Sequence, residues 1–339
     1  MCLLSFFGLF SCGNGYDNLD TEAFAKAVAG GDLAIVDVRT ADEYAAGHLP
    51  GASNCDWFAS DFMDKMASYP KETPLALYCR SGKRSAAAAA KLSKAGYRVS
   101  NLLGGYLAWT EEKRPVTKYA VETFFTDGGR PVMLTLIKHG TLALNYNGLS
   151  VHVDPVTECG KHTDYATEFP KADIILVTHE HFDHLDKDAV SALSKEGTLL
   201  VTNERCAEML GYGTVMGNGD SMDLPGGVHL DAVPAYNTTE GRLQFHPKGR
   251  DNGFVLTIDG LRIYIAGDTE DIPEMADLKD IDIAFLPVNQ PYTMTPEQCI
   301  RAARILSPKV LIPYHFGQTD LSSIPGALKE IDVRLRSME

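Results

Sequence analysis

Three features that would narrow the class of protein are missing from this chain of 339 residues. No apolar run reaches the roughly 18–20 residues of a membrane-spanning helix, so we expect no transmembrane span. The seven cysteines are odd in number and contain no Cys-x-x-Cys pair, which excludes a disulfide framework and a thiolate zinc site. A basic surplus is also missing, because 31 Lys and Arg face 45 Asp and Glu. This balance argues against nucleic acid as a partner, since phosphates need a basic face.

Charge and histidine are unevenly distributed along the chain. Residues 1–120 hold 13 basic and 13 acidic side chains, whereas residues 121–339 hold 18 and 32 and therefore carry the whole net charge of −14. Nine of the ten histidines also lie in the second part. At roughly 150 residues per domain, the length predicts about two domains. The uneven distribution of charge and histidine predicts that the two domains differ in chemistry and that the second domain holds a cation site.

The first 15 residues contain a short apolar run that ends in Leu9-Phe-Ser-Cys12. This run resembles the apolar region and lipobox of a bacterial lipoprotein signal, although the basic residues that usually precede it are missing and the first lysine is Lys26. Two locations therefore stay open. A periplasmic or membrane-anchored lipoprotein, attached through Cys12, is as well supported as a cytoplasmic protein. Residues 1–15 are excluded from the predicted fold in either case.

Residues 16–115 alternate strand and helix patterns, which is typical of an α/β domain with a parallel sheet and flanking helices. Residues 116–131 contain Gly128-Gly129 and Pro131 and are predicted to form a linker. Residues 132–339 begin with short strands joined by turns and continue with strands that alternate with helices. This order predicts two sheets sandwiched between helices, an αββα arrangement.

Cys79 follows a predicted strand and stands at the start of an alanine-rich helix, in the sequence Cys79-Arg-Ser-Gly-Lys-Arg-Ser85. The backbone N–H groups and the dipole of such a helix start stabilise an anion and should lower the pKa of the thiol. Arg80, Lys83 and Arg84 add positive charge. A thiolate placed in this way can attack a sulfane sulfur and carry it as a persulfide. The Cys-x4-Arg spacing forms a smaller ring than the Cys-x5-Arg loop of tyrosine phosphatases, and it suits sulfur better than phosphate.

Residues of about 16–115 resemble a single-domain rhodanese. The resemblance rests on a series of short motifs, which are Ile35-Val-Asp-Val-Arg39, Glu43-Tyr44, Gly47-His-Leu-Pro-Gly-Ala52, Cys79–Ser85, Leu102-Leu-Gly-Gly105 and Trp109. It implies that Cys79 is the sulfur-carrying nucleophile. It also implies that the loop binds a small anionic sulfur donor, such as thiosulfate or a persulfide, through Arg80, Ser81, Gly82, Lys83 and Arg84. Asp37 and Arg39 are expected to support the loop, and His48 belongs to a turn and is not expected to bind a ligand.

A second motif, His179-Glu-His-Phe-Asp-His184, follows another predicted strand. It places four imidazole and carboxylate side chains within six residues, a combination that suits zinc, iron or manganese. This is the HxHxDH signature of the metallo-β-lactamase superfamily, which residues of about 131–339 resemble. The resemblance identifies Asp268, in Gly-Asp-Thr, as a bridging ligand and His315 as the final histidine ligand. Asp154 is expected to support a ligand rather than to be one.

One histidine of the superfamily pattern is missing at its usual place, near Tyr236-Asn237. Between the motif and Asp268 the chain offers only His229, inside a predicted strand, and His246, in a loop. His246 is therefore the candidate for this ligand, although an ordinary surface histidine is the competing interpretation.

The resulting hypothesis is a binuclear hydrolase site with two divalent metal ions, zinc first and manganese or iron as alternatives. One ion would have His179, His181 and His246, the other would have Asp183, His184 and His315, and Asp268 would bridge them. Two such ions acidify water for attack on a carbonyl or phosphoryl centre, and Asp183 could take the proton. Further motifs, among them Phe245-His-Pro-Lys248, resemble the ascorbate-6-phosphate lactonase-like branch. The substrate stays open among an ester, a lactone and a phosphodiester.

Two alternatives to this bifunctional sulfurtransferase and hydrolase stay open. Persulfide dioxygenases share the metal fold, use one iron and are often fused to rhodaneses, although their His-Thr-Pro-Gly-His stretch is absent from this sequence. Alternatively, the rhodanese half could be a non-catalytic persulfide carrier or docking module. The sequence predicts neither the oligomeric state nor a coupling between the two sites.

Overall fold

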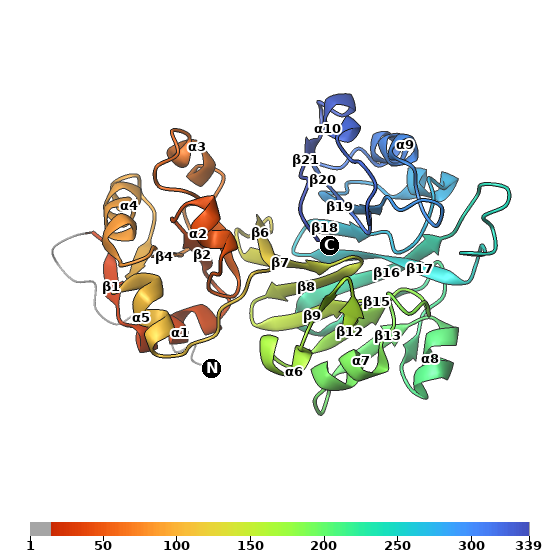
Figure 1. Cartoon of the computed structure of the whole chain (residues 1–339), viewed down its shortest axis with the longest axis horizontal. Coiled ribbons are helices and arrows are strands. Elements are labelled where there is room, and N and C mark those ends of the chain that lie inside the picture. The colour runs from red at the N-terminus through yellow and green to blue at the C-terminus, as the bar shows by residue number, and fades with distance from the viewer. Residues whose placement is uncertain (1–14, 339) are drawn as a thin grey trace. The chain divides into compact units, whose positions relative to one another are not determined.

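The computed structural model describes residues 15–338 and divides into two units (Figure 1). The first unit comprises the described residues up to Phe125 together with two short segments, Gly129–Met133 and Tyr146–Gly148, and the second comprises the rest. The apolar run that ends at Cys12 lies outside the described residues. Within residues 15–338, none of the helices combines the length and apolar character that crossing a membrane requires.

The first unit contains a five-stranded parallel sheet in the order β1-β5-β4-β2-β3. Both of its faces are covered, because alternate residues of strand β2 enter different cores. Val36 belongs to one apolar cluster and Ile35 to another. This confirms the α/β rhodanese fold. The elements are β1 (Asp17–Leu19), α1 (Thr21–Ala29), β2 (Ala34–Asp37), α2 (Ala41–Ala45), β3 (Ala52–Asn54), α3 (Phe62–Met66), β4 (Leu75–Tyr78), α4 (Lys83–Lys94), β5 (Val99–Leu102) and α5 (Gly105–Glu111).

Two seven-stranded sheets follow, one in the order β14-β13-β12-β9-β8-β7-β6 and the other running from β15 to β21. Strand β6 lies within residues 116–131, the predicted linker. The strands are β6 (Ala120–Phe125), β7 (Pro131–Lys138), β8 (Thr141–Tyr146), β9 (Leu149–Val153), β12 (Ile174–Val177), β13 (Leu199–Thr202), β14 (Thr214–Val215), β15 (Ser221–Leu224), β16 (Val228–Ala235), β17 (Asp251–Ile258), β18 (Leu261–Ile265), β19 (Ile283–Pro287), β20 (Val310–Tyr314) and β21 (Asp332–Val333). A separate hairpin consists of β10 (Glu158–Cys159) and β11 (Lys161–His162).

Helices lie beside each of these sheets, so the αββα sandwich is confirmed (Figure 1). In the second sheet, Tyr264 and Leu286 share a buried apolar cluster with Ala302, Ala303 and Ile324 of the covering helices. The helices are α6 (Tyr165–Glu168), α7 (Lys187–Leu193), α8 (Glu204–Leu210), α9 (Pro296–Leu306) and α10 (Ser323–Ala327), with short 3-10 turns η1 (Pro225–Gly227) and η2 (Pro273–Asp277).

The polar residues of interest follow directly after the ends of buried strands. His139 follows β7, Thr178-His179 follow β12, and His315 follows β20. Asp268 stands three residues beyond β18, which pairs in parallel with β19, as β19 does with β20. Because parallel strands end at the same edge of a sheet, this topology brings side chains from distant parts of the sequence to one edge.

Candidate metal centre and cysteine loop

Two groups of histidine and aspartate side chains come together in the second unit. Within each group, one ligand atom from every member lies within 4.8 Å of the others, so each group could hold a metal ion. The first group consists of His179, His181, His246 and Asp268. The second group consists of His139, Asp183, His184 and His315.

Asp268 lies between the two groups and directs one carboxylate oxygen to each. Its Oδ1 is 3.3 Å from His184 Nε2 and 3.4 Å from His315 Nε2. Its Oδ2 is 3.3 Å from His246 Nε2 and 3.9 Å from His179 Nε2. This is the arrangement that a carboxylate bridging two cations requires. The low exposure of Asp268 makes the arrangement costly unless positive charge balances it.

Several buried atoms of these groups fit a metal better than a hydrogen-bonded core. His184 Nε2, Asp268 Oδ1 and His315 Nε2 are buried and make no hydrogen bond among residues 15–338. Buried polar atoms normally find a partner, and leaving one unsatisfied costs about 1–3 kcal/mol. Imidazole nitrogens and carboxylate oxygens that converge without hydrogen-bond partners are a donor set suited to divalent zinc, manganese or iron.

The other ring nitrogens are occupied by groups that set the orientation of each imidazole. His184 Nδ1 lies 2.7 Å from Asp154 Oδ2, and Asp154 also accepts hydrogen bonds from the backbone and hydroxyl of Thr178. His246 Nδ1 lies 2.7 Å from Asn237 Oδ1. A nitrogen that donates to an oxygen leaves the opposite nitrogen with its lone pair free. In both rings the opposite nitrogen is Nε2, and in both it faces Asp268 at 3.3 Å.

His139 is a member of the second group that the sequence reasoning missed. Its Nε2 lies 3.1 Å from Asp183 Oδ2, and its ring centroid is 3.6 Å from that of His315. The sequence places it directly after a strand, as it does His179, and within the branch motif Ile137-Lys-His-Gly140, but outside the HxHxDH signature. His139, Asp154 and His315 also share a left-handed backbone, with φ of 46–47°. Such strain in non-glycine residues costs roughly 1 kcal/mol or more each and is typical of functional sites.

Within the two groups, the surroundings favour the neutral form of His179 and the charged forms of His184 and Asp268. Burial lowers the pKa of His179 well below its usual value, and the neighbouring His184 lowers it further. Burial also disfavours the charged form of His184, but the carboxylates of Asp268 and Asp154 outweigh it and raise the pKa of His184. Burial alone would raise the pKa of Asp268, yet His315 and His184 hold this pKa well below the usual range. A metal ion would compete with these protons for the same atoms.

The cysteine loop of the first unit also has the geometry of an anion cradle. Cys79 is buried behind the start of α4, and the Ser85 hydroxyl donates to its Sγ at 3.5 Å. Burial raises the pKa of the thiol, but hydrogen bonds from Ser85 and from the backbone of the loop outweigh it and lower the pKa below the usual value. Gly105 packs so closely on the loop that a Cβ would lie 2.3 Å from the Cys79 carbonyl oxygen, and its φ is 60°. Only glycine fits there.

The positive charges of this loop are not equivalent. Arg84 donates two hydrogen bonds, of 2.7 and 2.8 Å, to the carboxylate of Glu43, and this contact lowers the pKa of Glu43 to about 2. Arg80 and Lys83 are exposed. The charge of Arg84 is therefore partly neutralised by Glu43, a partner that lies far from it in the sequence. Arg80 and Lys83 are the exposed cations of the loop that carries Cys79.

The remaining polar residues of the rhodanese motifs make contacts elsewhere in the first unit. Arg39 pairs with Asp37 in the core and donates to the Gly47 carbonyl at 2.7 Å. Both ring nitrogens of His48 contact backbone carbonyls, those of Tyr44 and Tyr119.

Loss of the Ser85 hydroxyl should raise the pKa of Cys79. The hydroxyl donates to a buried sulfur, and a hydrogen bond to a charged group contributes about 1.5–3 kcal/mol, so Ser85→Ala should raise this pKa by about one to two units. The measurement is the pH dependence of Cys79 alkylation by iodoacetamide, with Ser93→Ala on the same helix as the control. An unchanged alkylation profile would contradict this account of the thiolate.

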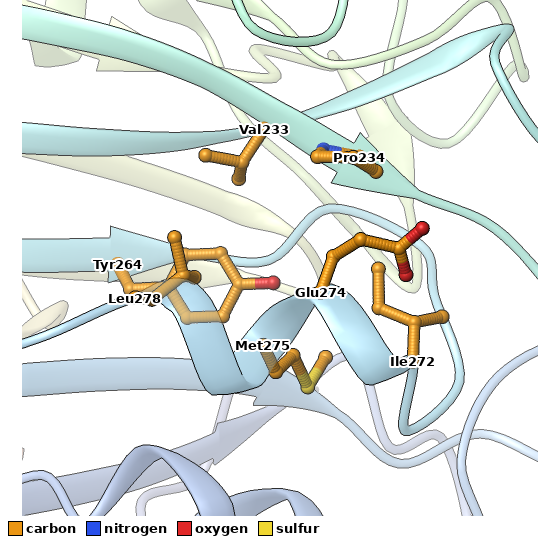
Figure 2. Close-up of a pocket in the computed structure, with 7 residues that line it drawn as sticks. All are labelled: Val233, Pro234, Tyr264, Ile272, Glu274, Met275 and Leu278. Atoms are coloured by element: carbon orange, nitrogen blue, oxygen red, sulfur yellow. The ribbon is translucent and has the colours of Figure 1, made fainter.

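A small pocket near the second sheet does not belong to either site. Figure 2 shows that it is lined by side chains of β16, β18 and the η2 region: Val233, Pro234, Tyr264, Ile272, Glu274, Met275 and Leu278. Its volume of about 10 Å³ leaves room for no more than one water molecule. It is therefore not a substrate site.

Comparisons with known proteins agree with this architecture. A model of the Beta-lactamase superfamily domain matches residues 133–315, and a model of the Rhodanese-like domain matches residues 20–112. A UPF0173 metal-dependent hydrolase of Geobacillus sp. (strain WCH70) is 32% identical over 190 residues, which cover 52% of this chain and 82% of that protein.

Two solved structures extend the comparison. One, described as a metal-dependent hydrolase from Parabacteroides distasonis, is 55% identical, has a TM-score of 0.63, and covers 65% of this chain and 100% of its own. Igni18, described as a metallo hydrolase from Ignicoccus hospitalis, shares the fold at 24% identity with a TM-score of 0.52. The match covers 61% of this chain and 95% of Igni18. The first family model spans more than half of the chain, so the chain belongs to the beta-lactamase superfamily and carries a rhodanese-like domain before that domain.

Proposed function

We propose that this chain is a metal-dependent hydrolase with a binuclear centre, joined to a sulfurtransferase that works through Cys79. The observation that carries the first half is the position of Asp268, whose two oxygens each face a different group of histidines. The superfamily membership and the metal-dependent hydrolases among the relatives support the same reaction class. Zinc is the first choice for both ions, with manganese or iron as alternatives.

The ligand assignment follows the two groups. His179, His181 and His246 would hold one ion, and Asp183, His184 and His315 would hold the other, with Asp268 shared. His139, the remaining member of the second group, would support Asp183, whose Oδ2 lies 3.1 Å from its Nε2. When bound, the ions supply Lewis acidity and a water of lowered pKa. The protein orients these side chains through Asp154 and Asn237, which fix His184 and His246.

Asp183 is the proposed proton acceptor of the hydrolase site. Its Oδ2 lies 3.1 Å from His139 Nε2 and 3.4 Å from His315 Nε2. Burial would raise the pKa of Asp183, but these two histidines hold it far below the usual range, so the carboxylate stays ionised. Ionisation suits this carboxylate to hold a metal ion, and its proposed role as proton acceptor rests on its place beside the metal groups.

In the rhodanese domain, the Cys79 thiolate attacks the outer sulfur of thiosulfate. The S–S bond of the donor breaks, sulfite leaves with the bonding electrons, and Cys79 carries the sulfur as a persulfide. A thiophilic acceptor then takes this sulfur and regenerates the thiolate. The lowered pKa of Cys79 and the exposed Arg80 and Lys83 support this role.

Metal analysis separates the hydrolase from the alternative of a persulfide dioxygenase, which uses a single iron. The presence of two ligand groups rather than one favours the hydrolase. We expect the purified protein to contain about two ions of zinc or manganese per chain and to consume no oxygen with glutathione persulfide. One iron per chain together with oxygen uptake would instead establish the dioxygenase.

A further inference from the structure

Phe182 is the most exposed large apolar side chain in the described part of the chain. Its side chain is 81% exposed, although it stands between His181 of one metal group and Asp183 of the other. An exposed phenyl group costs free energy in water, roughly in proportion to its area, and a fully buried phenylalanine recovers about 1.5–3 kcal/mol. Phe182 therefore offers apolar surface beside the metal centre.

A second apolar group adjoins His246, a member of the first metal group. Tyr292 is 47% exposed, and its ring centroid is 5.1 Å from that of Phe245, which directly precedes His246. Asn237 ties this pair to the metal group, because its Nδ2 donates to the Tyr292 carbonyl at 2.8 Å and its Oδ1 lies 2.7 Å from His246 Nδ1.

The two apolar groups are connected through neighbouring imidazoles. The rings of His181 and His246 lie 4.9 Å apart, and each histidine is adjacent in the chain to one of the apolar residues, Phe182 or Phe245. Leu243, on the loop that carries His246, adds a third exposed apolar side chain. Exposed apolar side chains on two different loops therefore adjoin histidines of the metal centre.

The cations of the loop that carries His246 are already paired. Arg242 lies 3.7 Å from Glu270, Lys248 lies 2.6 Å from Glu274, and Arg250 lies 2.7 Å from Asp251. In addition, residues 121–339 carry the whole net negative charge of the chain. An anionic substrate would find no unpaired cation among residues 238–250, so only the bound metal ions would offset its charge there.

We propose that the metal centre hydrolyses neutral carboxylic esters or lactones that carry an apolar acyl chain, with Phe182 and the Phe245–Tyr292 pair as specificity determinants. This inference rests on the proposed hydrolase function and selects within its substrate classes. In the reaction, water adds to the acyl carbon, the C–O bond breaks, and the released alkoxide takes up a proton as alcohol. Phosphodiesters are disfavoured because their charge finds no unpaired partner on this loop.

The test compares three probes on the metal-loaded full chain: 4-nitrophenyl acetate, 4-nitrophenyl hexanoate and bis(4-nitrophenyl) phosphate. We expect kcat/KM to be about 10-fold higher for the hexanoate than for the acetate, because each methylene that leaves water adds favourable free energy. In Phe182→Ser this ratio should fall about fivefold, while the metal content stays at the wild-type value. Ile305→Ser removes an exposed apolar side chain from α9 and should leave the ratio unchanged.

The outcomes distinguish this inference from the function on which it rests. An unchanged ratio in Phe182→Ser, or faster cleavage of the phosphodiester than of either ester by the metal-loaded wild type, would overturn the substrate class and leave the hydrolase standing. Failure of the wild type to bind metal would overturn both. A metal-loaded protein that cleaves neither ester would likewise overturn the inference.

Discussion

Asp268→Ala should remove both metal ions from the purified protein and lower hydrolysis of 4-nitrophenyl acetate by more than about 100-fold. The reason is geometric: the two oxygens of Asp268 face different groups, at 3.3 Å from His184 Nε2 and 3.3 Å from His246 Nε2. Removing it leaves each group with neutral or positively charged imidazoles and one carboxylate fewer. The measurement is the metal-to-protein ratio by mass spectrometry after exhaustive dialysis.

The contrast with His246→Ala makes this prediction specific. His246 faces only the first group, so its loss should reduce the ratio from about two ions to about one. Asp223→Ala serves as a matched control, because Asp223 is an exposed aspartate that contacts the half-buried His229. Circular dichroism of every variant reports whether it folds. Retention of two ions by a folded Asp268→Ala protein would contradict the assignment of Asp268 as the ligand shared by both ions.

The candidate metal centre shows which residues a sequence can predict and which it cannot. The HxHxDH motif, Asp268 and His315 could be identified because each follows a strand and belongs to a short pattern. His246 could be named only by elimination, since the contact that places it is with Asn237, nine residues away across a loop. The structure brings its Nε2 to within 3.3 Å of Asp268.

His139 escaped prediction for a different reason. Its position depends on a left-handed backbone, with φ of 46°, between β7 and β8. A histidine seldom adopts this conformation, and the cost is repaid by tertiary contacts that local sequence does not encode. The partner of Arg84 was equally hidden, because Glu43 lies 41 residues earlier in the chain. The α/β and αββα folds could be predicted because alternating apolar segments encode them directly.

Cys79→Ser should abolish transfer of sulfur from thiosulfate to cyanide, with a loss of more than about 1,000-fold. The serine hydroxyl is not ionised near neutral pH and cannot hold a sulfane sulfur, whereas the loop lowers the pKa of the Cys79 thiol. Cys79 is buried and accepts a hydrogen bond from Ser85, and serine fits the same space, so the variant should fold. The measurement is thiocyanate formation at saturating thiosulfate.

Cys159→Ser is the matched control, because Cys159 is a partly exposed free cysteine on the β10–β11 hairpin of the other unit. It should retain wild-type activity, which would assign the transfer to Cys79. Mass spectrometry after incubation with thiosulfate should also show an added mass of about 32 Da on the wild type and on Cys159→Ser, but not on Cys79→Ser. A persulfide on Cys79 without thiocyanate formation would mark the domain as a carrier that delivers sulfur to another acceptor. If the folded wild type shows neither the added mass nor thiocyanate formation, the sulfurtransferase is refuted and a docking module is favoured. A Cys79 thiolate that never takes up sulfur would serve neither sulfur transfer nor sulfur storage.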